Sequence, residues 1–215
     1  MLKEIKEYAR ASWIPVILDD SLKYIEEEIL KGKKLNKILE IGTAIGYSSI
    51  CFSKFLTENG KIDTIEIDKQ RIMIAKVNTD MMGVSDKINI IEGDALKVIK
   101  KLDDKYDFIF IDGPKSHYIE YLPICLNLLQ KDGVIIADNI LYKGMVTGNY
   151  TDHKQRTAVN RLRQFIDMVE NDTSLTHKLV DVGDGLMIIQ KAWCYFFSLK
   201  FWKSFHFGSF FCIII

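Results

Sequence analysis

Three side chains with oxygen donors stand where two apolar stretches of the sequence end. Asp112 closes the stretch YDFIFID, and Asp138 and Asn139 close the stretch GVIIADN. If these stretches are neighbouring parallel strands, their carboxyl ends meet at one edge of the sheet and bring the three side chains together. Two carboxylates and an amide oxygen suit a hard cation, Mg²⁺ or alternatively Mn²⁺ or Ca²⁺. The competing interpretation, an Asp-Asn cap of a turn, leaves the second acid at Asp112 unaccounted for.

Lys115 follows Asp112 by three residues, within reach of the same site. A lysine held beside a cation and partly buried gives up its proton more readily than a lysine in water. A cation also acidifies a hydroxyl group bound to it. The pair predicts general-base catalysis by Lys115, with Asp112 beside it: a hydroxyl group loses its proton, and its oxygen attacks an aligned methyl group. The competing interpretation is a surface lysine in a Gly-Pro turn.

The stretch LEIGTAIGYSS, residues 39–49, indicates a strand, a glycine turn and then a helix. Its glycines, Gly42 and Gly46, do not fit the dinucleotide pattern G-x-G-x-x-G, in which the second glycine admits a pyrophosphate. Ala44 stands at that second position, and Glu40, just before the turn, would repel a phosphate. An acid there suits a cationic group instead, such as the ammonium group of an amino acid.

Two more acids close the next two predicted strands. Glu66 lies 24 residues after Gly42, where an acid typically binds ribose hydroxyl groups. Asp94, in the stretch EGDA, is placed to contact an adenine amino group. A nucleoside with an amino-acid arm and no phosphate meets all of these features, and S-adenosylmethionine is such a molecule. Ordinary turn chemistry is the alternative for each feature alone. A NAD-dependent oxidoreductase is disfavoured by Ala44, and a non-catalytic binding module with the same fold remains open.

Strands must alternate with helices to hold these residues. Short apolar runs, nearly free of charge, predict strands that are covered on both faces, and glycines mark the ends of the helical stretches between them. The strands are expected at Lys37–Ile41, Lys61–Ile67, Ile88–Glu92, Tyr106–Ile111 and Gly133–Ala137. The helices are expected at about Tyr47–Glu58, Lys69–Met82, Ala95–Lys101 and His117–Gln130. Such a βαβ series predicts a parallel sheet with right-handed crossovers.

A long helix at about Lys154–Glu170 precedes two further strands, roughly His177–Val182 and Leu186–Gln190. The Asp-Gly pair between these strands is typical of a hairpin turn. The predicted fold class is therefore α/β: a Rossmann-like, seven-stranded, mostly parallel sheet with an antiparallel C-terminal edge hairpin and helices on both faces. Two helices within residues 1–31, at about Lys3–Arg10 and Asp20–Leu30, are expected to cover the site.

Composition limits the other possibilities. Lysine plus arginine equals aspartate plus glutamate at 29 each, so net charge alone favours neither a nucleic acid nor a membrane as partner. The four cysteines have no zinc spacing, and the first residues carry no signal-peptide run, so we expect a cytoplasmic protein. We expect residues 1–191 to form a single domain and the aromatic-rich tail, residues 192–215, to lie outside it. Lysines interrupt the tail, so no stable membrane association is expected.

The stretches LEIGTAIGYSS, IEID, EGDA, FIDGPK and ADN resemble the class I cation-dependent O-methyltransferases, which include catechol and caffeoyl-CoA O-methyltransferases. The resemblance spans about Ala9 to Lys191. It implies Asp112, Asp138 and Asn139 as metal ligands and Lys115 as the base. It also implies a homodimer. Around S-adenosylmethionine it implies Glu40, Gly42, Gly46, Ser48, Glu66, Asp94, Ala95 and Asp112, and the stretch WIPVI adds Val16, whose backbone would contact the methionine part.

The short N-terminus and the stretch DNILYKGMV most resemble a bacterial branch, the tRNA 5-hydroxyuridine methyltransferases, which make 5-methoxyuridine at the wobble position of the anticodon. The 5-hydroxyl and O4 of that base could chelate a metal as the two oxygens of a catechol do. Nearby basic residues could bind phosphates, or could form a solvated helix face. They are Lys143, Lys154, Arg156, Arg161 and Arg163, with Asp152 as the one acid among them. A small catechol-like or CoA-ester acceptor is the alternative, and Tyr47, Tyr118 and Tyr142 could stack on any flat acceptor.

Overall fold

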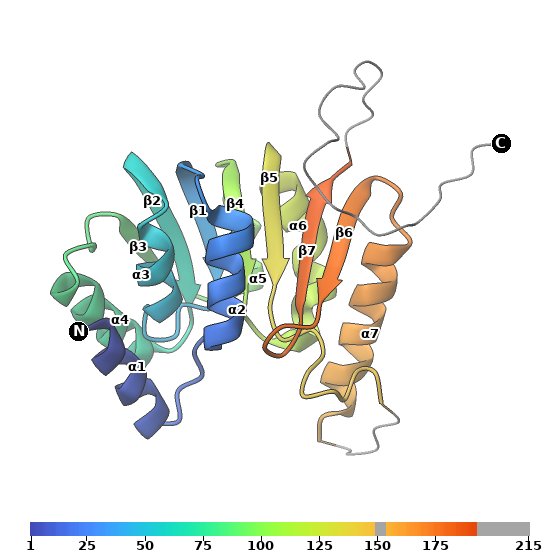
Figure 1. Cartoon of the computed structure of the whole chain (residues 1–215), viewed down its shortest axis with the longest axis horizontal. Coiled ribbons are helices and arrows are strands. Elements are labelled where there is room, and N and C mark those ends of the chain that lie inside the picture. The colour runs from blue at the N-terminus through green and yellow to red at the C-terminus, as the bar shows by residue number, and fades with distance from the viewer. Residues whose placement is uncertain (149–153, 193–215) are drawn as a thin grey trace.

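The computed structural model describes residues 1–148 and 154–192, so the predicted tail lies outside the described residues from position 193 onward. The described part forms an α/β fold around one seven-stranded sheet, with α2 in front of it and α6 behind it in Figure 1. The strands are β1 (Leu35–Ile41), β2 (Leu56–Glu66), β3 (Ile88–Glu92), β4 (Tyr106–Ile111), β5 (Leu129–Ala137), β6 (Leu175–Val180) and β7 (Leu186–Lys191).

The order of strands across the sheet is β3-β2-β1-β4-β5-β7-β6. Strands β1 to β5 pair in parallel, whereas β7 runs antiparallel to both β5 and β6. The predicted fold class is confirmed, including the antiparallel C-terminal hairpin. Strands β1, β2, β4 and β5 therefore all end at the same edge of the sheet, which is where the candidate residues were expected.

Two hydrophobic clusters, one on each face, bury the sheet. Strand side chains such as Ile109 and Ile135 pack beneath α5 (Ala95–Ile99), α6 (Tyr118–Leu128) and α7 (Arg156–Glu170). The neighbouring side chains Phe108 and Phe110 point the other way. The helices that cover this second face are α1 (Leu2–Ala11), α2 (Asp19–Tyr24), the π-helix η1 (Ile25–Leu30), α3 (Tyr47–Ser53) and α4 (Lys69–Met81). Burial on both faces explains why the strands read as continuous apolar runs.

Two predicted helices end earlier than expected because the next strand begins earlier. The helix predicted at Tyr47–Glu58 stops at Ser53, and β2 starts at Leu56, which pairs with Leu35 of β1. The register of this pairing shifts after Leu35, and a Cβ on Gly60 would lie 2.7 Å from the Leu35 carbonyl oxygen. Glycine thus marks an irregularity inside a strand here, and not the end of a helix as predicted.

The second such case lies at β5, whose predicted start was Gly133. The helix predicted at His117–Gln130 ends at Leu128, and β5 begins at Leu129, opposite Tyr106 of β4. The register shifts after that pair, and a Cβ on Gly133 would lie 3.0 Å from the Tyr106 carbonyl oxygen. Both strands are therefore longer at their amino ends, away from the candidate site.

The N-terminal helices pack on one face of the sheet, through buried side chains such as Ile5 and Ile25. The part that reaches the candidate site is the segment between α1 and α2, which contributes Pro15, Val16 and Leu18. Among the described residues, no helix combines the length and the apolar character that a membrane span requires.

Candidate active site

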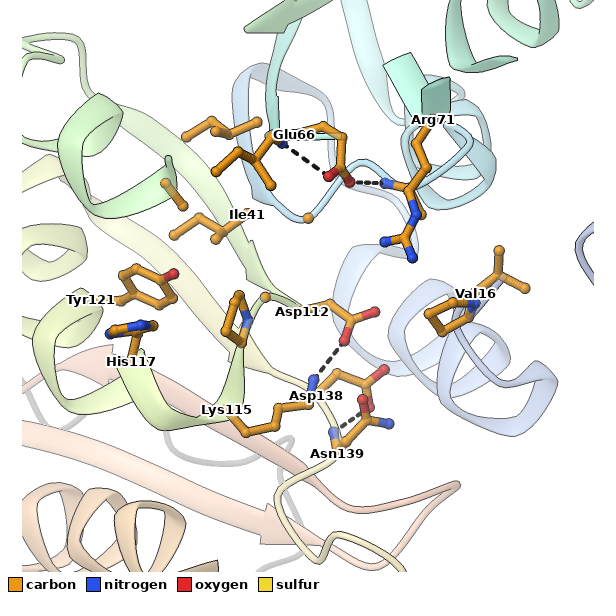
Figure 2. Close-up of a pocket in the computed structure, with 18 of the residues that line it drawn as sticks. Val16, Ile41, Glu66, Arg71, Asp112, Lys115, His117, Tyr121, Asp138 and Asn139 are labelled. Atoms are coloured by element: carbon orange, nitrogen blue, oxygen red, sulfur yellow. Dashed lines mark hydrogen bonds and ion pairs between the residues drawn. The ribbon is translucent and has the colours of Figure 1, made fainter. Parts of the chain in front are cut away.

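A cavity of about 1080 Å³ opens at the carboxyl ends of β1, β2, β4 and β5. Its walls come from the glycine turn after β1, the segment before α2, the starts of α4, α5 and α6, and the turn between β6 and β7. Figure 2 shows Glu66 on one side of this space and Asp138 and Asn139 on the other, with Asp112 between them. Polar side chains from distant parts of the sequence thus converge where open α/β sheets bind ligands.

The glycine turn passes close to the end of β4. Gly42 has a φ of +106°, and a Cβ on it would lie 2.5 Å from the Asp112 carbonyl oxygen, so no larger residue fits without displacement. Ala44 also has a positive φ, +47°, and its N–H donates to Glu66 Oε2 at 2.9 Å. Gly46, with a φ of +81°, precedes the first residue of α3. It does not line the cavity. This strained backbone is held by its neighbours, as is common at ligand sites.

Glu40 does not reach the cavity, contrary to the expectation that it receives an ammonium group. The side chain is fully buried, and its two oxygens accept hydrogen bonds from the hydroxyl groups of Ser48, Ser49 and Thr64. Burial raises the pKa of the Glu40 carboxyl to about 7. Ser48 donates to Glu40 and is likewise absent from the cavity wall. These two predicted ligand residues therefore lie behind the glycine turn.

Glu66, Asp94, Ala95 and Val16 do line the cavity, as predicted. Glu66 Oε1 accepts the N–H groups of Ile67 and Asp68 at 2.9 and 3.0 Å. Together with the N–H of Ala44, these backbone donors hold the carboxylate at the edge of the cavity. Each carboxylate oxygen has two lone pairs, so the group keeps acceptor capacity for further donors. Asp94 Oδ1 accepts the N–H of Lys97 at 3.0 Å as the N-cap of α5.

The predicted metal ligands Asp112, Asp138 and Asn139 lie together on the cavity wall (Figure 2). Asp138 is fully buried; its Oδ1 accepts the Asn139 N–H at 2.7 Å, and its Oδ2 has no hydrogen-bond partner among the described residues. Burial, followed by the negative charge of Asp112, raises the pKa of the Asp138 carboxyl. A buried carboxylate oxygen without a donor, beside a second carboxylate, fits a cation site.

Asn139 has a φ of +56°, in the left-handed region that asparagine tolerates better than most residues. The set holds only two acids, and the described residues contain no cluster of three or more His, Cys, Asp or Glu side chains that could hold a metal. A site here therefore depends on the amide oxygen of Asn139 as its third protein donor.

Lys115 begins a short 3₁₀ turn, η2 (Lys115–His117), and points back over the end of β4. Its Nζ lies 2.7 Å from Asp112 Oδ1 and 2.8 Å from the Tyr118 hydroxyl oxygen. Only 13% of the side chain is exposed. The lysine is thus fixed beside the candidate metal ligands, as the three-residue spacing predicted.

Two residues of the predicted basic patch have partners within the fold. Arg161 pairs with Glu120 of α6. Arg163 donates to the carbonyl oxygens of Val146 and Gly148, at 2.9 and 2.6 Å. Asp152 lies outside the described residues. Of the three predicted stacking tyrosines, Tyr142 lines the cavity, whereas Tyr47 and Tyr118 are buried in the hydrophobic clusters.

Several cavity residues were not predicted from the sequence. Arg71 lies in the first turn of α4, and its side chain projects into the space between Glu66 and Val16 in Figure 2. His117 and Tyr121 line the wall near α6, with their ring centroids 6.0 Å apart. The position of Arg71, five residues after the acid that ends β2, was the one available signal, because it places the side chain on the helix turn above that acid.

Comparison with known proteins identifies the family. A family model described as O-methyltransferase matches residues 13–192, most of the chain. This chain belongs to that O-methyltransferase family. The enzyme class predicted from the sequence is thereby confirmed.

Individual relatives agree with the family match. A catechol O-methyltransferase from Niastella koreensis is 32% identical over 142 residues, covering 64% of this chain and 63% of the relative. A structure from Staphylococcus aureus assigned to the caffeoyl-CoA O-methyltransferases is 30% identical, with a TM-score of 0.82, covering 89% of this chain and 92% of its own. The methyltransferase PaMTH1 from Podospora anserina, solved with S-adenosylhomocysteine (SAH) bound, is 25% identical with a TM-score of 0.75, covering 89% and 87%. The predicted tRNA acceptor finds no support in these three relatives.

Proposed function

We propose that this enzyme transfers the methyl group of S-adenosylmethionine to one hydroxyl group of a flat acceptor that carries two neighbouring oxygens. The observation that carries the proposal is the convergence of Asp112, Asp138, Asn139 and Lys115 on the cavity that Glu66 also lines. A cavity of about 1080 Å³ is at the upper end of the usual range for small-molecule sites and has room for a cofactor and a small acceptor.

The cofactor is supported by the SAH bound to the relative PaMTH1 and by the chemistry of the wall. Glu66 offers lone pairs for the ribose hydroxyl groups, and Asp94 offers an oxygen for the adenine amino group. Val16 and the backbone of the glycine turn at Gly42 are left for the amino-acid arm, since Glu40 is already occupied by three hydroxyl groups.

Asp112, Asp138 and Asn139 fit a hard divalent cation, Mg²⁺ or alternatively Mn²⁺ or Ca²⁺. The fit rests on the unpartnered Oδ2 of Asp138 and on the repulsion between two close carboxylates, which a cation would offset. When bound there, the cation would hold the two acceptor oxygens and acidify the hydroxyl group.

Lys115 is the proposed base. Its Nζ, held by Asp112 and Tyr118, lies at the cavity wall where an acceptor hydroxyl would sit. In the proposed reaction the Lys115 nitrogen accepts the hydroxyl proton, the oxygen forms a bond to the methyl carbon, and the carbon–sulfur bond breaks to leave the thioether. Alignment of the three atoms is the main task of the site.

A small catechol-like acceptor is the one that the geometry supports best, because Arg161 pairs with Glu120 and Arg163 binds backbone carbonyl groups, which leaves fewer cations for phosphates. A CoA-ester acceptor, which carries phosphates of its own, is the alternative within the same chemistry. The tRNA wobble 5-hydroxyuridine, methylated to 5-methoxyuridine, is the second candidate. It is favoured by Lys143, which is exposed and lines the cavity. The homodimer implied by the family resemblance stays a prediction.

Labelled methyl transfer to matched acceptors tests the proposal. With methyl-labelled S-adenosylmethionine and Mg²⁺, we expect transfer to catechol and none to phenol, which lacks the second oxygen. Transfer to neither, or equal transfer to both, would count against the proposal. For the second candidate, wobble nucleosides from cells with and without this protein are compared by mass spectrometry. A 5-methoxyuridine signal that disappears with the protein would establish the tRNA acceptor.

A further inference from the structure

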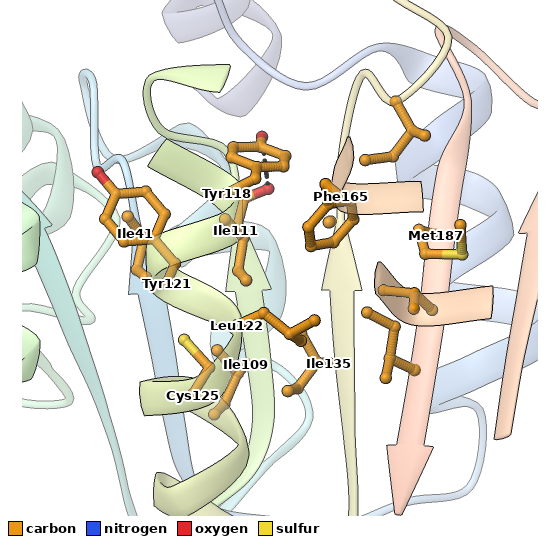
Figure 3. Packing of buried hydrophobic residues seen from close by; sticks show 14 of the residues in the cluster. Ile41, Ile109, Ile111, Tyr118, Tyr121, Leu122, Cys125, Ile135, Phe165 and Met187 are labelled. Carbon is orange, nitrogen blue, oxygen red and sulfur yellow. Dashed lines mark hydrogen bonds between the residues drawn. The ribbon is translucent and has the colours of Figure 1, made fainter. Parts of the chain in front are cut away.

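Tyr118 carries a hydroxyl group that meets three groups at the candidate site. The residue starts α6 and is fully buried, yet its hydroxyl oxygen lies 2.8 Å from Lys115 Nζ. The same oxygen lies 3.0 Å from the carbonyl oxygens of Ile111 and Asp138. Figure 3 shows the ring of Tyr118 above the end of β4, with its hydroxyl next to Ile111.

The proton balance of this hydroxyl is simple. A phenol has one O–H to donate and lone pairs with which to accept. Lys115 donates to the oxygen, and the O–H donates to one of the two carbonyl groups at a time. One carbonyl belongs to Ile111, which directly precedes Asp112, and the other belongs to Asp138 itself. The hydroxyl therefore joins the lysine to the ends of both strands that carry the candidate metal ligands.

We propose that Tyr118 is a positioning residue for methyl transfer, which sets the Lys115 amine against Asp112 at the ends of β4 and β5. The proposal rests on the proposed function, since it assigns a role within that reaction. Tyr118 does not line the cavity and touches neither cofactor nor acceptor in the proposed arrangement. It acts through Lys115.

The ring fixes where the hydroxyl sits. Tyr118 packs edge-on against Phe165 of α7, with centroids 5.6 Å apart and planes at 74°. The Lys115 Nζ lies 2.8 Å from the hydroxyl oxygen and 5.2 Å from the centroid of the ring, so the lysine meets the ring at its hydroxyl end. The end of the sheet does not need the hydroxyl to form, because β4 and β5 pair as far as Ile111 and Ala137, and the Asp138 N–H donates to the Ile111 carbonyl at 2.9 Å.

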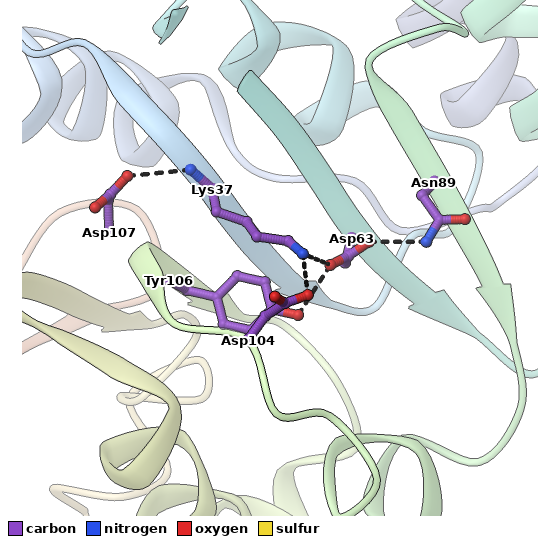
Figure 4. Close-up of polar contacts among 6 residues, drawn as sticks. All are labelled: Lys37, Asp63, Asn89, Asp104, Tyr106 and Asp107. Carbon is purple, nitrogen blue, oxygen red and sulfur yellow. Dashed lines mark hydrogen bonds and ion pairs between the residues drawn. The ribbon is translucent and has the colours of Figure 1, made fainter. Parts of the chain in front are cut away.

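A second tyrosine offers a matched control. Tyr106, at the opposite end of β4, is also fully buried, and its hydroxyl donates to Asp63 Oδ2 at 2.9 Å, beside Lys37 (Figure 4). Both hydroxyl groups are buried and hydrogen-bonded, so removing either costs stability. Only Tyr118 contacts the candidate base. Tyr118→Phe and Tyr106→Phe therefore separate a positioning role from a purely structural one.

The test compares the two variants with the wild-type chain in methyl transfer from S-adenosylmethionine to catechol with Mg²⁺. For Tyr118→Phe we expect kcat to fall about 10-fold, as loss of the hydrogen bond that positions the base suggests, with the KM for S-adenosylmethionine within about twofold. For Tyr106→Phe we expect a lower melting temperature with kcat within about twofold. In a Lys115→Ala background, Tyr118→Phe should lower kcat by less than about twofold, because the group it positions is gone.

Each outcome decides the proposal. An unchanged kcat in Tyr118→Phe, or a loss of equal size with and without Lys115, would overturn the positioning role while leaving the proposed function intact. Failure of Tyr118→Phe to fold would also overturn it, since the role then would be structural. A wild-type chain without activity on catechol would instead overturn the proposed function and this role with it.

Discussion

Replacing Glu40 with glutamine tests how the glycine turn is held. Glu40 is fully buried among the hydroxyl groups of Ser48, Ser49 and Thr64, and burial raises the pKa of its carboxyl from 4.5 to about 7. The folded chain therefore keeps a proton that the unfolded chain releases between these values. Stability from this group is complete below pH 4.5 and is lost as the pH rises through about 7, the reverse of the usual carboxylate case.

The magnitude follows from the two pKa values. Between pH 5 and pH 8 a group shifted in this way lowers the free energy of unfolding by about 2.5 kcal/mol. Glutamine resembles the protonated carboxyl in shape and charge and does not titrate. As the pH rises from 5 to 8, we therefore expect the stability of Glu40→Gln relative to the wild type to increase by about 2.5 kcal/mol.

Urea unfolding of both chains at pH 5, 6, 7 and 8, without added cofactor or cation, measures this difference. Groups other than Glu40 contribute equally to both chains and cancel. Glu58→Gln, at an exposed position of β2, is the control and should leave the pH dependence unchanged. If the difference between the wild type and Glu40→Gln stays constant within about 0.5 kcal/mol from pH 5 to 8, the buried-acid account is refuted.

Three further predictions concern the site. Gly42→Ala should lower kcat at least about 10-fold, because its Cβ would lie 2.5 Å from the Asp112 carbonyl oxygen, whereas Gly83→Ala, also at positive φ but with nothing within 4 Å, should cost only about 1 kcal/mol of stability. Lys115→Ala should lower kcat about 100-fold or more while the Kd of SAH, measured by calorimetry, stays within about threefold. Arg163→Ala should lower the free energy of unfolding by about 1 kcal/mol, measured by urea titration, because it leaves partly buried carbonyl groups without their donor.

Each of these has a contrary result. Equal turnover in Gly42→Ala and Gly83→Ala would mean that the glycine turn does not constrain Asp112. Equal losses of turnover and of SAH binding in Lys115→Ala would assign that lysine to binding. If Arg163→Ala is as stable as the wild type but binds tRNA more weakly, Arg163 binds phosphates and does not stabilise the fold.

The strands, their mostly parallel pairing and the C-terminal hairpin were predictable because their signals are local. Runs such as residues 106–111 carry nothing but apolar side chains and one charge, which only a strand covered on both faces accommodates. Acids at the ends of such runs then share an edge for topological reasons alone. The amino-acid sequence by itself therefore predicts that Asp112, Asp138 and Glu66 lie around one cavity.

The features that sequence reasoning missed depend on partners far along the chain. Glu40 was expected to contact the ligand, but the hydroxyl groups of Thr64, on the neighbouring strand, and Ser49, on α3, donate hydrogen bonds to its carboxyl group. Arg163 was expected to bind phosphates, but it donates hydrogen bonds to backbone carbonyl groups within residues 145–148. In both cases the charged residue was identified correctly and its partner was not, because a polar group removed from water binds the donors or acceptors that the fold brings within reach.

Whether Asp112, Asp138 and Asn139 hold a divalent cation can be measured by Mn²⁺ binding in the presence of SAH, followed by electron paramagnetic resonance. We expect one Mn²⁺ bound per wild-type chain, with affinity at least about 10-fold weaker in Asp138→Ala. Asp104→Ala, which removes an acid at the opposite edge of the sheet beside Lys37, should leave binding unchanged. Equal Mn²⁺ binding by the wild type and Asp138→Ala, or no binding by either, would contradict this assignment.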